Sequence, residues 1–224
     1  TDIARGSARL FGIRLMRNFR FPYFSRGPSD FWQRWHISLS SWFRDYLYIP
    51  LGGNRFGNLL TLRNPVITML LAGLWHGAAW TFVVWGGYHG LLLVLYRVTP
   101  LLRNLEEGET GLYWRRPLSI AVMFTLTLIG WVIFRAPDFA YVINWFAALG
   151  VTDLENAVSA VKPFQWLLIH VIPLLLLQWW TRKEQNEASM STLPLKARVP
   201  IYLFMTLFII SSIQHDQEFI YFQF

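Results

Sequence analysis

A pair of histidines lies in a stretch of the chain that carries no formal charge. Residues 64–96 contain no Lys, Arg, Asp or Glu, so His76 and His89 are the only side chains there that titrate near neutral pH. An ionisable side chain at membrane depth is costly, and by default it marks a functional site. His76 is followed by Gly77 and preceded one turn earlier by Gly73, which leaves room for a substrate beside the imidazole. Because a neutral imidazole accepts a proton near pH 7, His76 is our candidate general base.

Two other histidines are weaker candidates for chemistry. His36 lies in an apolar aromatic stripe, and a lone histidine in such a stripe more often packs than reacts. His89 follows His76 by about 220° around a straight helix, so the two share a face only if the helix bends. A two-histidine metal site within 64–96 is therefore not favoured, and no H-E-x-x-H spacing occurs. Structural packing is the preferred interpretation of His89.

The composition is that of an integral membrane protein. Hydrophobic residues make up 54% of the chain and charged residues only 15%, against about 25% in soluble domains. The formal charge of +7 comes entirely from residues 1–63, which hold ten Arg and three Asp. These arginines are interleaved with aromatic residues, which favours a cytoplasmic membrane flank over nucleic-acid binding. There is no cysteine and no G-x-S-x-G motif, so the sequence offers no obvious covalent nucleophile.

The element that carries His36 is predicted to be a helix over residues 29–47. Ser29 is suited to cap its N-terminus, and Asp30 and Arg34 are spaced as a favourable i,i+4 pair. Aromatic and aliphatic residues recur at three- and four-residue steps along it, which predicts a helix lying at the membrane interface.

The segment 64–96 is predicted to open with Asn64 as N-cap and Pro65 in the first turn. It is too long for one upright span of ~20 residues and short for two. We therefore expect a long tilted helix, a bent one, or a span with a re-entrant piece. Further spans are predicted at about 118–134, 163–181 and 199–215.

The basic loops predict an orientation in the membrane. Residues 1–63, 97–116 and 182–198 are expected on the cytoplasmic side, and residues 135–162 and the C-terminus on the other. For this arrangement the segment 64–96 must enter the membrane and return to the same side.

Two long stretches resemble the membrane-bound O-acyltransferase (MBOAT) family, in its bacterial alginate O-acetylation branch. They are FWQRWHISLSSWFRDYLYIPLGGNR at 31–55 and MLLAGLWHGAAWTFVVWGGYHG at 69–90. The resemblance implies the C-terminal part of a longer protein: an all-α integral membrane protein of several spans that form a ring around a tunnel, with re-entrant and interfacial helices inside. It places the family's catalytic histidine, in the W-H-G motif, on His76. It places the second active-site position, in W-H-x-S-L-S, on His36; in the wider superfamily that position can be Asn or Asp.

The activity that this resemblance implies is O-acyl transfer in the inner membrane of a bacterium. An acetyl group would move from acetyl-CoA or another cytoplasmic acyl thioester towards hydroxyls of an exported polysaccharide such as alginate. His76 would act as base with assistance from His36, and a periplasmic or extracellular partner protein would complete the transfer. We expect no bound cofactor, no metal and no nucleic-acid partner.

Two hypotheses from other functional classes compete with this one. A conduit or transporter for an acyl donor or lipid-linked sugar would need no chemistry, although coupled transporters often place charged residues at depth. A non-catalytic scaffold subunit of a polysaccharide-secretion complex would merely pack its histidines, and it predicts that His36 and His76 lie apart. An enzyme needs the two side chains to converge on one cavity.

Overall fold

The computed structural model describes residues 2–107, 115–148, 171–172, 175 and 194–212, and within these all regular structure is helical. The chain divides into two compact units, Thr1–Val151 and Thr152–Phe224, which are considered separately. Unit 1 contains the turn that holds His36 and the helix that ends at His76. They are, in order, α1 (Asp2–Leu10), the 3-10 turn η1 (Pro22–Phe24), α2 (Pro28–Trp32), α3 (Ile37–Phe43), the π-helical η2 (Arg44–Tyr48), α4 (Gly57–His76), α5 (Trp80–Val98), α6 (Pro100–Glu107), α7 (Arg115–Arg135) and α8 (Phe139–Ala148).

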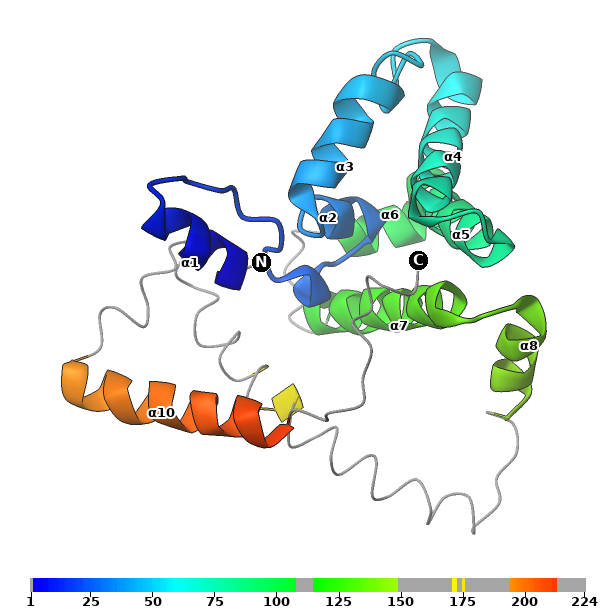
Figure 1. The fold of residues 1–224 in the computed structure, drawn as a ribbon. Helices are drawn as coiled ribbons and strands as arrows, with labels where there is room; N and C mark the ends of the chain where they lie inside the picture. The colour runs from blue at the N-terminus through cyan, green and yellow to red at the C-terminus, as the bar shows by residue number, and fades with distance from the viewer. Residues whose placement is uncertain (1, 108–114, 149–170, 173–174, 176–193, 213–224) are drawn as a thin grey trace. The chain divides into compact units, whose positions relative to one another are not determined.

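Helices α4 and α5 form a tight hairpin from the uncharged segment 64–96 (Figure 1). Gly77 ends α4 with a φ of 154°, a backbone conformation that favours glycine, and α5 begins three residues later. Two glycines allow the close approach, because a Cβ at Gly73 would meet the Phe82 carbonyl oxygen and one at Gly86 would meet the Met69 carbonyl oxygen. A bend was one of the three alternatives predicted for this segment, and it is present directly after His76.

The predicted start of this segment was wrong. Helix α4 begins at Gly57, so Asn64 and Pro65 lie inside it. Asn64 is fully buried, and its Nδ2 donates hydrogen bonds to the carbonyls of Leu51 and Gly53 at 3.1 and 2.9 Å. The side chain therefore anchors the preceding turn instead of capping a helix.

The single helix predicted over 29–47 was also wrong. The chain forms α2, a turn over 33–36, then α3, which continues directly into η2. Gly27 is the N-cap of α2 with Pro28 in its first turn, so Ser29 does not cap it. The break is stabilised from a distant part of the chain, because the Arg34 carbonyl accepts a hydrogen bond from the Arg20 N–H.

The predicted pair of Asp30 and Arg34 is present. The Asp30 Oδ1 accepts a hydrogen bond from the Arg34 Nε, and Oδ2 accepts one from the Arg26 N–H at 3.0 Å. The Asp30 N–H in turn donates to Glu106 of α6 at 3.0 Å. This network fixes α2, which precedes the His36 turn, against α6.

Within the described residues, α5 and α7 are long and apolar enough to cross a membrane. They pack together, and the Tyr88 hydroxyl donates to the Leu126 carbonyl at 2.8 Å. Their outer faces expose large apolar side chains such as Leu91 and Leu128, at 56% and 47%, which suits contact with lipid.

The remaining sequence predictions fall on these elements as follows. The predicted span 118–134 lies within α7, and α6 forms inside 97–116, which was expected to be loop. In unit 2, α10 (Leu195–Ser212) covers the predicted span 199–215 as far as Ser212. The predicted span 163–181 falls almost wholly outside the described residues.

Candidate functional site

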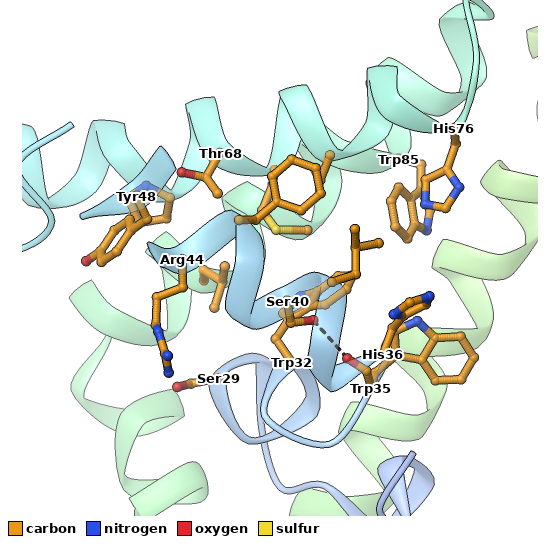
Figure 2. Close-up of a pocket in the computed structure, with 16 residues that line it drawn as sticks. Ser29, Trp32, Trp35, His36, Ser40, Arg44, Tyr48, Thr68, His76 and Trp85 are labelled. Atoms are coloured by element: carbon orange, nitrogen blue, oxygen red, sulfur yellow. Dashed lines mark hydrogen bonds between the residues drawn. The ribbon is translucent and has the colours of Figure 1, made fainter. Parts of the chain in front are cut away.

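His36 and His76 line the same cavity, although His36 lies in the turn before α3 and His76 at the end of α4. The cavity has a volume of about 280 Å³ and lies between the α2–η2 segment and the α4–α5 hairpin (Figure 2). Its wall is mostly aromatic and aliphatic. The lining residues are Ser29, Trp32, Trp35, His36, Leu39, Ser40, Phe43, Arg44, Tyr48, Pro65, Thr68, Met69, Ala72, His76, Trp85 and Leu93.

His76 is held at the end of α4 by aromatic rings. The imidazole meets Trp85 edge-on at 5.3 Å between ring centroids and Phe134 of α7 at 5.0 Å. The side chain is half-buried, and it projects into the cavity because Gly77 ends the helix immediately afterwards. Apolar rings fix the orientation of the imidazole without competing for its nitrogen atoms, which leaves them available to a substrate.

His36 is presented by an unusual backbone. It has a φ of 43° and a ψ of 55°, the left-handed region, and stands as the N-cap of α3. Its side chain makes no capping hydrogen bond, and its Nδ1 is buried without a hydrogen-bond partner among the described residues. The ring meets Phe19 edge-on at 5.9 Å. Figure 2 shows the imidazoles of His36 and His76 at the same end of the cavity, facing a shared space.

The other end of the cavity is polar and carries Arg44, the one charged side chain among the described residues that line it. Ser29, Arg44, Tyr48 and Thr68 gather there, away from the histidines (Figure 2). Arg44 donates to Asp45 from Nε at 2.7 Å and from a terminal nitrogen at 3.2 Å. The hydrogen bond from Arg44, together with its positive charge, holds the pKa of Asp45 below its usual value. A ligand in the cavity would thus meet imidazoles at one end and a guanidinium at the other.

His89 lies outside this cavity, and its surroundings fit the predicted packing role. It is 2% exposed and stacks on Phe31, with 6.1 Å between ring centroids and 6° between planes. Trp32 and Trp85 meet it edge-on at 5.1 and 4.9 Å. No group of three or more His, Cys, Asp or Glu able to hold a metal ion occurs within the described residues.

Trp85 is a site residue that the sequence did not indicate. It is 4% exposed, lines the cavity and touches both His76 and His89. The sequence places it among apolar neighbours, where an aromatic residue is unremarkable. Trp85 comes into contact with His76 only because α5 packs back along α4, and the sequence does not show this contact.

Comparison with known proteins now adds independent information. The model of the MBOAT, membrane-bound O-acyltransferase family matches residues 2–128, a range that contains both cavity histidines. A protein of Azotobacter vinelandii named "Probable alginate O-acetylase AlgI" is 46% identical over 179 residues, which are 77% of this chain and 34% of that protein.

Relatives with other acceptors in their names are also similar. The peptidoglycan O-acetyltransferase of Helicobacter pylori is 41% identical over 139 residues, 61% of this chain and 25% of that protein. The teichoic acid D-alanyltransferase of Streptococcus thermophilus is 34% identical over 143 residues, 57% of this chain and 34% of that protein. The chain spans about a third or less of the length of these relatives. It belongs to the membrane-bound O-acyltransferase family of multi-span membrane proteins.

Proposed function

We propose that the complete protein transfers acetyl groups from a cytoplasmic acyl thioester towards hydroxyl groups of an exported polysaccharide such as alginate. The observation that carries this proposal is the convergence of His36 and His76 on one cavity. The similarity to proteins named for alginate and peptidoglycan O-acetylation supports the acetyl group and the polysaccharide acceptor.

In the proposed reaction His76 acts as the general base. Its neutral imidazole accepts the proton of the attacking hydroxyl as the oxygen adds to the thioester carbonyl, and the new C–O bond forms. The C–S bond then breaks, and the imidazolium returns the proton to the departing thiolate. General base catalysis of this kind is worth roughly 10²–10⁴-fold.

His36 is proposed to orient and polarise the reacting group. Its unpartnered Nδ1 lies at the same end of the cavity as His76, so the ring can hydrogen-bond to the substrate while His76 handles the proton. Holding two reactants in place can lower a barrier by up to ~7–11 kcal/mol, more than the base alone supplies.

The surroundings proposed for this reaction are those of the family fold. The complete protein would form a ring of spans around a tunnel in the bacterial inner membrane, with shorter re-entrant and interfacial helices inside the ring. The donor, acetyl-CoA or another thioester, would enter from the cytoplasmic side, and a periplasmic or extracellular partner would receive the acetyl group. The aromatic cavity wall would keep water away from the thioester.

The two competing hypotheses fit the cavity less well. A scaffold subunit predicted histidines that lie apart, whereas His36 and His76 line one space. A conduit gives no reason for an imidazole held on three sides by aromatic rings at a helix end.

The test is alginate O-acetylation in cells that lack their own membrane subunit and express the complete protein. We expect His76→Ala to reduce acetylation at least about 100-fold and His36→Ala by about 10- to 100-fold. Asn58→Ala, on the exposed first turn of α4, is the matched control. Normal acetylation by His76→Ala at a normal protein level would refute the proposed role.

A further inference from the structure

The start of helix α3 is capped from outside the helix. The first backbone N–H groups of a helix have no partner within it, and the N-cap side chain normally accepts one of them. In α3 the N-cap is His36, and its imidazole makes no such bond. Asn18, which is distant in sequence, instead supplies the acceptors for two of these N–H groups.

Asn18 binds the two N–H groups that follow His36. Its backbone carbonyl accepts from the Ile37 N–H at 2.9 Å, and its side-chain Oδ1 accepts from the Ser38 N–H at 2.9 Å. The next bond along, from the Arg20 N–H to the Arg34 carbonyl at 2.9 Å, ties the same two segments on the other side of His36. The turn is thus held on both sides by residues 18–20.

This arrangement explains how a non-glycine residue remains in the left-handed region. That conformation is unfavourable for residues with a Cβ, and it persists only where the surrounding structure determines it. The hydrogen bonds to Asn18 hold His36 in this conformation. Because they also satisfy the first N–H groups of α3, the imidazole is not required as a capping acceptor. We propose that Asn18 is a positioning residue, which holds the His36 turn so that the imidazole points at the space it shares with His76.

This inference rests on the proposed function. A positioning role and a purely structural role of Asn18 predict different effects of its substitution. If Asn18 acts through His36, its loss lowers kcat and has little effect on substrate binding. If Asn18 only stabilises the fold, its loss lowers the amount of protein or acts equally with and without His36.

The experiment measures transfer from acetyl-CoA labelled in the acetyl group to alginate, in membranes from cells that make the complete protein together with its acetyl-transfer partners. We expect Asn18→Ala to lower kcat about tenfold and to leave KM for acetyl-CoA within about twofold. Asn18→Asp keeps an acceptor oxygen at the same place, so its kcat should stay within about threefold of the parent. Asn58→Ala, an exposed asparagine, is the control for the substitution itself.

A double-mutant cycle then separates positioning from stability. In the His36→Ala background, Asn18→Ala should cause no further loss, because the side chain that it positions is already gone. Another tenfold loss in that background, or a parental kcat for Asn18→Ala, would overturn the inference. If Asn18→Ala does not accumulate, Asn18→Gln, which displaces the acceptor by one methylene, replaces it with the same expectations. Full activity of both His36→Ala and His76→Ala would overturn the proposed function and this inference with it. Activity that requires the histidines but is unchanged by substitution of Asn18 would overturn the inference alone.

Discussion

The α4–α5 hairpin offers a paired test at two adjacent glycines. A Cβ at Gly86 would meet the backbone of α4, namely the Met69 carbonyl group and the Leu70 Cα at 3.1 Å. A Cβ at Gly87 would meet only the Leu70 Cδ2 at 3.4 Å, the far end of a flexible side chain. The two substitutions to alanine have the same chemistry in the same helix, and they differ in what the new methyl group contacts.

The expected magnitudes follow from these contacts. Replacing a helical glycine by alanine stabilises by roughly 0.5–1 kcal/mol, and Gly87→Ala should show this gain or no change. Overpacking against a backbone that must move costs about 1–3 kcal/mol. Gly86→Ala should therefore destabilise by up to about 2.5 kcal/mol, after the gain in helix propensity is subtracted.

The assay is thermal unfolding of the complete protein in detergent, with acetyl transfer measured in parallel. Gly86→Ala should lower the melting temperature, and it should also reduce activity because Trp85, its neighbour, supports the His76 ring. Gly87→Ala should be indistinguishable from the parent in activity. Equal melting temperatures for the two variants would show that the helices are not in backbone contact at Gly86, and the account of the hairpin would fail.

Two further substitutions probe residues outside the cavity, Asn64 in α4 and Tyr23 in η1. Asn64→Leu removes the donor to the Leu51 and Gly53 carbonyls in a fully buried place, so we expect it to destabilise the protein by about 1–3 kcal/mol in thermal melts; a melting temperature equal to that of the parent would contradict the anchoring role. Burial raises the pKa of Tyr23 above 10.0, so the folded state holds this proton more tightly than the unfolded state. The resulting stability is fully present below pH 10 and is lost as the pH rises through the folded-state pKa. Melts between pH 8 and 11 should therefore show a steeper decline for the parent than for Tyr23→Phe, and parallel declines would refute the shift.

The sequence predicted residues 64–96 better than the segment before them, although it left a tilted helix, a bent helix and a span with a re-entrant piece as alternatives. The uncharged run, its glycines and its awkward length indicated a bend, and the bend lies at Gly77. The start at Asn64 was wrong because a side chain with capping ability is used here to bind a turn. Local residue preferences do not reveal which of these two roles an asparagine takes, since the difference depends on a partner loop.

The break at His36 could not be predicted from residues 29–47 alone. The aromatic residues recur at helical steps straight through it, and several of them face the cavity on both sides of the turn. What interrupts the helix is a set of hydrogen bonds from residues 18–20. Periodicity indicates which side chains share a helix face. It contains no information on a segment distant in sequence whose groups form hydrogen bonds with the backbone of this helix.

The left-handed backbone at His36 limits which amino acids suit that position. Among residues with a Cβ, asparagine, aspartate and histidine tolerate this conformation best, and β-branched residues tolerate it least. Asn or Asp at position 36 would therefore suit the backbone of this turn and would still carry a polar group beside the cavity. Val, Ile or Thr would strain the same turn, whatever their chemistry.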